Sequence, residues 1–467
     1  MTEGRLFRRH AIAAAGIALY CAGLLSPLIH AVGHTGPPLR WLGLLLLGWA
    51  AWRKRSLTGW IFWAMLAGGE LGADAPGFAI SLRVFSDIFL RLIKTIVAPL
   101  ILGTLITGIA AHGQMRSLGR MGLKALVYFE VLTTVAMLVG LAAINITRAG
   151  VGLSVPQQHA AANIPTVQAP LHWDEVLLHT FPENIAKSVA ENQILQVAVF
   201  AILFGVAMGR LSAENRASLL RVVESLTQTM FAFTNIVMYY APVGVGAAMA
   251  YTVGQMGTGV LLHLGRLLFT LYAALLAFGL VGLLPAALIA GVPIRRFLRA
   301  VAEPATIAFA TSTSEAALPR AMEAMEALGV PRRIVAFVIP AGYSFNLDGS
   351  TLYLALASVF VAQAAGVTMG WKQQMFMVAT LMLTSKGVAG VPRATLIVLL
   401  ATVAMFHLPE EPIFVILGID ALMDMARTSV NVVGNCLASV VVARWEGQFG
   451  IEAPAVETLE ALSVPEA

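Results

Sequence analysis

Residues 420–435 read DALMDMARTSVNVVGN, which places two aspartates, one arginine and two asparagines inside an otherwise apolar segment. Three more stretches have the same character: AFATSTSEAALP at 308–319, PAGYSFNLDG at 340–349 and TSKGVAGVP at 384–392. A charged side chain at the centre of a bilayer costs roughly 2.5–3.5 kcal/mol on insertion scales. These segments are therefore poor passive anchors, and their polar residues are functional candidates, with mutual structural pairing as the alternative.

Composition sets the class of protein. Of 467 residues, 58% are hydrophobic and only 12% are charged, against about 25% charged in soluble domains. Several apolar runs reach the roughly 20 residues that a helix needs to cross a bilayer, and the alternating pattern of a β-barrel is absent. We therefore predict an all-α polytopic membrane protein.

The charge and the motifs exclude several function classes. The net charge of +5 comes from Lys and Arg in short loops, which is the orientation signal of membrane proteins, so we expect no nucleic-acid partner. No Walker A loop, metal-ligand pair at helical spacing or nucleophile elbow is present. The chain is expected to be neither an enzyme nor a primary pump, and to need no cofactor.

Residues 1–55 form an N-terminal extension. An apolar run at 11–29 follows three arginines, and a short apolar piece at 41–52 leads into the basic cluster at 53–55. We interpret these as an extra helical hairpin with both ends in the cytoplasm. At the other end of the chain, residues 447–467 are expected to be a cytoplasmic tail.

Residues 56–291 are predicted to form a scaffold of early transmembrane helices. Basic residues gather in three of the connections, which the positive-inside rule assigns to the cytoplasm. The predicted spans are 57–73, 84–112, 122–147, 191–209, 225–250 and 259–291.

Residues 292–446 are predicted to form a transport core. The segments 294–328 and 372–408 are each long enough for two half-crossings and carry small and polar residues at their middle. We interpret both as re-entrant hairpins whose tips meet inside the protein, because non-helical backbone at membrane depth must be buried or line a cavity. Two helices with polar centres follow, at 331–366 and 412–444. Hairpin plus helix thus occurs twice with opposite orientation, an inverted repeat. With the six spans of the scaffold, we predict about eight transmembrane helices plus the two re-entrant hairpins.

Each of the two helices carries a polar cluster. Residues 346–349, Asn-Leu-Asp-Gly, are expected to unwind the first helix and expose carbonyls that bind a cation. In the second helix, spacings of three and four residues predict that one polar stripe faces one cavity. The stripe consists of Asp424, Arg427, Thr428, Asn431 and Asn435.

The stripe suggests a ligand. A guanidinium fork matches a carboxylate bidentately, so Arg427 is expected to hold an acid group. Asp424 is placed to hold an ammonium, while Asn431 and the hairpin-tip amides are placed for a second carboxylate. Together they describe an acidic amino acid. An intrahelical salt bridge between Asp424 and Arg427 is the alternative.

Two further carboxyls are candidates for carrying a proton. Glu130 lies in an apolar span and Glu315 lies at the first hairpin tip. Burial without a cationic partner favours the neutral form of a carboxyl. A structural, hydrogen-bonding role is the alternative for each.

At these four motifs the sequence resembles the dicarboxylate/amino acid:cation symporter family, from about residue 57 to 444 and most like its bacterial proton-glutamate branch. The resemblance implies a homotrimer in the bacterial inner membrane, in which the core moves against the scaffold. It also implies that Arg427 binds the substrate's side-chain carboxylate, Asp424 its amino group and Asn431 its main-chain carboxylate. The further substrate contacts it implies are Thr313, Ser314, Ser350, Ala389 and Gly390.

The coupling ion is where the chain departs from the family pattern. Sodium-coupled relatives carry Asp and Tyr where this chain has Asn435 and Phe129, so oxygen ligands for sodium are lost. Asn346, Asp348 and Ser344 match sodium-ligand positions, with Asn346 and Asp348 the candidate metal ligands, and carbonyls near Ser385 would complete the set. Leu354 replaces the Glu that carries the proton in animal relatives.

These observations predict a secondary active symporter for glutamate or aspartate, with the proton favoured over sodium as coupling cation. Glu130 and Glu315 are the expected proton carriers. The alternatives are a sodium-coupled C4-dicarboxylate symporter, or a channel-like anion conductance as a side activity.

Overall fold

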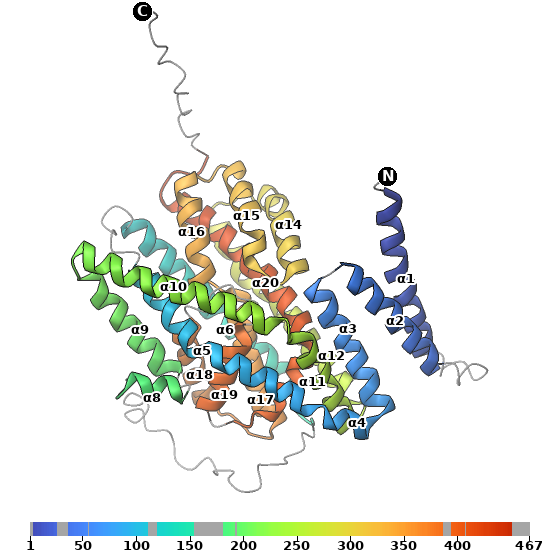
Figure 1. Ribbon diagram of the computed structural model, residues 1–467. Coiled ribbons are helices and arrows are strands. Elements are labelled where there is room, and N and C mark those ends of the chain that lie inside the picture. Colours follow the sequence, from blue (N-terminus) through green and yellow to red (C-terminus); the bar gives the residue numbers. More distant parts are fainter. Residues whose placement is uncertain are drawn as a thin grey trace, which may run out of the picture.

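The computed structural model describes residues 3–25, 36–54, 56–110, 119–153, 181–191, 194–385, 394–406 and 408–450. Every regular element in these ranges is helical. Four described stretches are long and apolar enough to cross a membrane, or five if one bent pair counts as a single span. The chain is therefore a multi-pass membrane protein, as its composition predicts (Figure 1).

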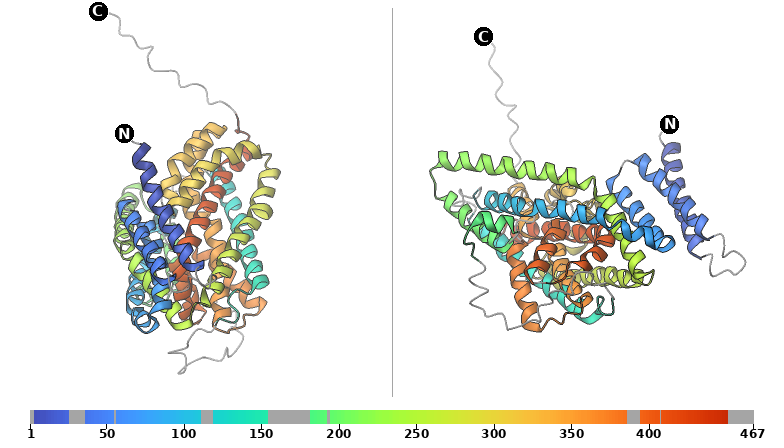
Figure 2. Two further views of the ribbon diagram at one scale, coloured as in Figure 1. Left: turned by 90° about the vertical axis from the view of Figure 1, so that its right-hand side faces the viewer. Right: turned by 60° about the horizontal axis from the view of Figure 1, so that its bottom comes forward.

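Two helices precede the predicted scaffold, α1 (Glu3–Leu25) and α2 (Gly36–Lys54). The second is longer than the apolar piece at 41–52 that we expected. It begins at Gly36 and continues through Pro37 and Pro38, because proline is tolerated in a first helical turn, where its missing N–H has no partner to lose. The two helices pack on each other and project beside α3 (Figure 2, right).

The scaffold follows the predicted spans with one correction. The predicted span 225–250 is two helices, α10 and α11, which meet at a bend of 50°. Pro242 at the start of α11 removes a backbone donor there, and α10 already begins at Ala213. The scaffold elements are α3 (Leu57–Asp74), α4 (Pro76–Ser81), α5 (Arg83–Ala110), α6 (Gly119–Thr147), α8 (Ile185–Ala190), α9 (Ile194–Gly209), α10 (Ala213–Met238), α11 (Ala241–Met256) and α12 (Val260–Phe278), which continues through a π-helical turn (Gly279–Leu283) into α13 (Leu284–Ile289).

The predicted hairpin at 294–328 is a pair of helices in contact, α14 (Ile294–Thr311) and α15 (Ser314–Leu328). The predicted hairpin at 372–408 comprises α18 (Trp371–Thr384) and α19 (Ala394–Met405). Its predicted tip at 385–392 falls outside the described residues, apart from Ser385. The two pairs lie toward opposite ends of the molecule (Figure 1), the placement that an inverted repeat requires. Their entry into a membrane from opposite sides stays a prediction.

The predicted helix at 331–366 is broken where expected. α16 (Arg332–Phe345) ends before Asn346, and α17 (Asp348–Ala364) begins two residues later. Only Asn346 and Leu347 leave the helix, because Asp348 and Gly349 already belong to the first turn of α17. The unwound segment is thus shorter than the four residues we predicted.

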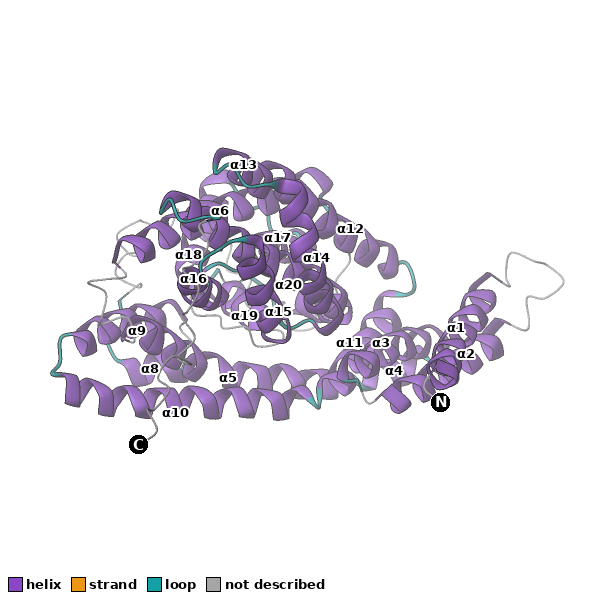
Figure 3. Ribbon diagram, turned by 90° about the horizontal axis from the view of Figure 1, so that it is seen from above, coloured by secondary structure: helices purple, strands orange, loops and turns teal. Residues whose placement is uncertain are grey.

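The last helix, α20 (Glu411–Trp445), is continuous over 35 residues and runs through the centre of the core. Seen from above, α5 and α10 lie side by side along one edge of the molecule, while α14 to α20 form the bundle beside them (Figure 3). Ion pairs join both ends of α20 to the scaffold. Lys94 Nζ lies 2.7 Å from a Glu410 carboxylate oxygen, and Lys124 Nζ lies 2.6 Å from Glu446 Oε1.

Close packing at glycine sets the spacing between α6 and α17. A Cβ added to Gly140 would lie 2.3 Å from the Leu352 carbonyl oxygen. We expect Gly140→Ala to lower the free energy of unfolding by about 1–3 kcal/mol, because helix backbones would have to separate. Thermal unfolding of the purified protein in detergent measures the change.

Gly265→Ala is the matched control. Gly265 lies inside α12, where an added Cβ would have nothing within 4 Å. There alanine should be neutral or slightly stabilising, since it favours the helix. Equal losses in both variants would show that the contact at Gly140 does not limit the packing.

Candidate functional site

The polar stripe predicted on α20 is buried throughout. It faces the break between α16 and α17, and three glycines make this approach possible. An added Cβ would lie 2.4 Å from the Arg427 carbonyl oxygen at Gly349, 2.2 Å from Asn435 Oδ1 at Gly342 and 2.6 Å from Asp348 Oδ2 at Gly434. The predicted stripe residues are Asp424, Arg427, Thr428, Asn431 and Asn435, and the structure adds Asp420, which is also buried.

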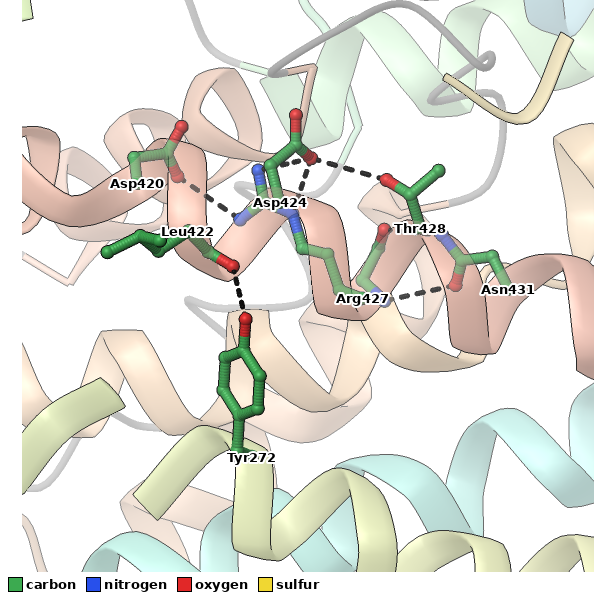
Figure 4. A network of polar contacts seen from close by, with 8 residues as sticks. Tyr272, Asp420, Leu422, Asp424, Arg427, Thr428 and Asn431 are labelled. Atoms are coloured by element: carbon green, nitrogen blue, oxygen red, sulfur yellow. Dashed lines mark hydrogen bonds and ion pairs between the residues drawn. The ribbon is translucent and has the colours of Figure 1, made fainter. Parts of the chain in front are cut away.

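Arg427 is the largest side chain that is fully buried. Its Nη2 lies 2.9 Å from Asp424 Oδ1, and its Nη1 donates to Asp420 Oδ1 at 3.2 Å. The guanidinium carbon lies 4.3 Å from the centre of the Tyr353 ring, a cation–π contact from α17. Figure 4 shows the arginine between its two aspartates, with Thr428 directed at Asp424. The intrahelical pair that the sequence left open as an alternative is therefore present and is extended by a second acid.

Asp420 and Tyr353 are the site residues to which sequence reasoning assigned no role. Asp420 lies seven residues before Arg427, close to two helical turns, so the helical period could have placed it on the same face. Tyr353 belongs to another helix. Its contact with Arg427 depends on how α17 packs on α20, which no local spacing encodes.

Asn431 caps a helix other than its own. Its Oδ1 accepts hydrogen bonds from the backbone N–H groups of Gly349 at 2.8 Å and Ser350 at 3.2 Å. Its Nδ2 donates to Ser350 Oγ at 2.9 Å. The first N–H groups of a helix lack internal partners and attract acceptors, as they also attract anions. Asn431 and Ser350, both predicted site residues, thus meet at the first turn of α17.

Asn346, Asp348 and Asn435 form a second polar cluster, fully buried beside the first. Asn346 Nδ2 donates to Asp348 Oδ2 at 3.1 Å and to Asn435 Oδ1 at 3.0 Å. Amide and carboxylate oxygens are the ligands that hard cations prefer. Among the described residues, no group of three or more His, Cys, Asp or Glu is arranged for a metal. A cation here would rest on this mixed oxygen set.

The first hairpin turns at Ser312, whose φ of 54° is left-handed. Thr313 lies in this turn, and its hydroxyl donates to Thr311 Oγ1 at 3.2 Å, while Ser314 is buried at the start of α15. The hairpin is attached to the site helix, because Ser429 Oγ donates to the Ala305 carbonyl at 3.0 Å. The predicted tip residues thus reach the α20 region through α14.

The remaining predicted residues differ in burial, and some of them lie outside the described part of the chain. Glu130 is half-buried in α6, which packs against α17. Glu315 lies in the first turn of α15, on the side of the helix that faces outward. It is therefore exposed, contrary to the burial that we expected. Ser385 is buried at the end of α18. Ala389 and Gly390 lie outside the described residues, as does the side chain of Ser344.

The charges of the site do not cancel. With every group ionised, Asp348, Asp420 and Asp424 contribute three negative charges and Arg427 one positive charge, a net of −2 from these four buried side chains. Buried charge of one sign is costly in a low-dielectric interior. The site therefore favours the entry of cationic groups.

Comparison with known proteins agrees with these motifs. The model of the sodium:dicarboxylate symporter family matches residues 57–445. A proton/glutamate-aspartate symporter of Escherichia coli is 41% identical over 411 residues, which cover 85% of this chain and 94% of the relative. A proton/sodium-glutamate symport protein of Bacillus caldotenax is 39% identical over 408 residues, 86% of this chain and 97% of the relative. A C4-dicarboxylate transport protein of Solibacter usitatus is 41% identical over 401 residues, with coverage of 85% and 94%.

The ring beneath Arg427 yields a prediction. Tyr353→Leu removes the aromatic face 4.3 Å from the guanidinium, a contact worth about 2 kcal/mol when desolvated. We expect the unfolding midpoint in a denaturing detergent, followed by circular dichroism, to fall clearly.

Tyr353→Phe is the control for this change, since it preserves the ring and should retain most of the stability. If Phe is as damaging as Leu, the hydroxyl rather than the ring face supports Arg427.

Proposed function

The chain belongs to the sodium:dicarboxylate symporter family, and we propose that it is a secondary active symporter that takes up glutamate or aspartate together with a cation. The observation that carries this proposal is Arg427, a buried guanidinium held between two aspartates beside the capped start of α17. We further propose a homotrimer in the bacterial inner membrane, which the resemblance supports. The hairpins and α16–α20 would move as a core against the scaffold by alternating access.

In this proposal, substrate recognition rests on Arg427 and on the two aspartates that lie seven and three residues before it on α20. Arg427 has five N–H donors, and the planar fork suits a carboxylate. When the substrate's side-chain carboxylate reaches Arg427, Asp424 can turn from the guanidinium to the substrate ammonium, so one ion pair is exchanged for two. Asp420 stays behind Arg427 and holds its orientation. The main-chain carboxylate would then lie toward Asn431 and the tip residues Thr313 and Ser314.

The site charge explains why a cation must accompany the substrate. With every group ionised, the four buried side chains sum to −2, and glutamate or aspartate adds −1. A summed charge of −3 inside a membrane protein is costly. Cations that enter with the substrate remove this obstacle, which couples the two movements.

We favour the proton as the coupling cation. Asn435 and Phe129 supply neither the carboxylate nor the hydroxyl that a sodium site would use, while Glu130 and Glu315 offer carboxyls that can take up a proton. The names of the relatives include both proton and proton/sodium symporters. Asn346, Asp348 and carbonyls near Ser385 form the alternative sodium site.

A C4-dicarboxylate substrate is the second candidate, because one relative carries that name. Asp424 argues against it, because a substrate carboxylate on Arg427 would leave this aspartate beside a second acid unless the substrate also carries an ammonium group. A channel-like anion conductance as a side activity stays a prediction, which current recordings from the purified protein in a planar bilayer would test.

Substrate selectivity tests the two charges separately. Arg427→Ala should lower the uptake of glutamate and aspartate at least roughly a hundredfold, because the substrate carboxylate loses its charged partner. Asp424→Ser should instead shift preference from amino acids to succinate, because only the ammonium loses its partner. Uptake of the labelled substrates into proteoliposomes measures both.

Each variant is the control for the other, since both remove a charge from the same buried cluster. Equal losses for all substrates in the two variants would favour the purely structural salt bridge. Unchanged glutamate and aspartate affinity in Arg427→Ala would disprove the assignment of the arginine.

Coupling is tested by imposing one ion gradient at a time. An inward proton gradient should drive accumulation in sodium-free buffer. If Glu130 or Glu315 carries the proton, changing that residue to Gln should abolish uptake driven by the proton gradient. Substrate exchange should continue, because exchange needs no net proton movement.

Glu323→Gln is the matched control, since Glu323 lies on α15 and is exposed like Glu315, but is paired with Arg320. It should transport as the unmodified protein does. Uptake that requires sodium and ignores the pH gradient would show that Asn346 and Asp348 provide the coupling site.

A further inference from the structure

Two acidic residues of α3 point away from the transport core. Glu70 and Asp74 lie near the end of α3, and their partners come from α1 and α2. Both of these helices precede residue 57, where the family match begins. The extension therefore supplies the charge partners of a helix that belongs to the family core.

The contacts between them form one cluster. Arg40 Nε lies 2.9 Å from Glu70 Oε2, and Arg40 Nη2 lies 3.2 Å from Asp74 Oδ1. The Tyr20 hydroxyl donates to Glu70 Oε1 at 2.8 Å, and Trp41 Nε1 donates to Asp74 Oδ2 at 2.8 Å. The side chain of Glu70 is only 7% exposed and that of Arg40 only 17%. α1 contributes one donor to this cluster, and α2 contributes two donor side chains.

Glycine lets the helices of the extension approach closely. An added Cβ on Gly43 would lie 2.7 Å from the Tyr20 backbone nitrogen, and one on Gly23 would lie 2.9 Å from that of Arg40. Trp63 of α3 donates its indole N–H to the Leu44 carbonyl at 2.8 Å. Small residues that bring backbones together are typical of helix contacts in membranes. The hairpin is thus packed on α3 and is not loosely tethered to it.

The opposite face of α3 is already occupied. An added Cβ on Gly68 would lie 2.2 Å from the Gly246 carbonyl oxygen, and one on Gly72 would lie 2.7 Å from that of Ala250, both in α11. Glu70 and Asp74 consequently have the extension as their neighbour on the outer side. Without it, these carboxylates would face the surroundings of the protein.

The outer face of α2 is apolar. Leu42, Leu45, Trp49 and Trp52 follow spacings of three, four and three residues and are exposed by 48%, 66%, 47% and 68%. Arg53 follows them, and its guanidinium lies 4.8 Å from the Trp49 ring centre. Tryptophan and arginine at the end of an apolar stripe are typical of the membrane–water interface. The extension covers a charged face of α3 and presents an apolar face in its place.

We propose that α1 and α2 form a membrane-embedded pair of helices that stabilises the family core, in which Arg40 is the counter-ion of Glu70 and Asp74 and the stripe on α2 contacts the acyl chains of the bilayer. Removing one partner of a buried ion pair strongly destabilises a protein, whereas removing both sides is far milder. The hairpin therefore stabilises α3 and, through α11, the part of the scaffold that lies beside the transport core.

The full chain tests this proposal through charge removal and restoration. Arg40→Gln should lower the melting temperature of the purified protein and its yield in membranes. Arg53→Gln is the matched control, an arginine of the same helix that is exposed and contacts Trp49; it should leave both unchanged. Adding Glu70→Gln and Asp74→Asn to the Arg40→Gln chain should recover most of the loss.

Non-additivity is the decisive result. If Arg40→Gln behaves like Arg53→Gln, or if neutralising Glu70 and Asp74 adds a further loss of stability, Arg40 is not the counter-ion of these two acids. The measurement uses stability and yield alone, so it stands whether or not the chain transports acidic amino acids.

Discussion

The buried guanidinium of Arg427 is the interaction on which the arrangement of the core depends. A cation can be kept away from water only if acids and an aromatic face replace its hydration. Asp420, Asp424 and the Tyr353 ring do so from two helices. This requirement fixes how α17 lies against α20, and the glycines at their crossing let the backbones come near enough to meet it.

The same residues are suited to transport because an ion pair among them can be broken and replaced by one with another charged group. In the proposed mechanism the ion pair between Arg427 and Asp424 is exchanged for one with an incoming acid, at a cost that the incoming charges offset. A core of leucine in this place would be more stable, but it would offer nothing to exchange. In the proposed mechanism, polarity at this depth lowers stability but allows the site to bind and release its substrate.

Sequence reasoning predicted most of the helices because a membrane helix must form its backbone hydrogen bonds internally and is recognisable by its length and hydropathy. α3, α20 and the outer ends of the pair α14–α15 lie within about one residue of their predicted bounds. The start of α10 was missed, since its charged first half resembles a loop in composition, and the bend between α10 and α11 was not predicted. The stripe on α20 was predictable from helical spacing, whereas the Tyr353 contact, the cap by Asn431 and the Arg40 cluster join residues far apart in sequence. Such contacts follow from tertiary packing, which local pattern does not encode.

The cap on α17 bears on how the protein is made. Gly349 and Asn431 are 82 residues apart, so the ribosome completes α17 long before its capping side chain exists. During that interval the first turn of α17 has to satisfy its N–H groups with water or with another surface, and the helix pair α16–α17 cannot adopt its final form within the membrane. The insertion of α20 is therefore the step in biogenesis at which the first turn of α17 gains its cap and the polar residues of the core come together.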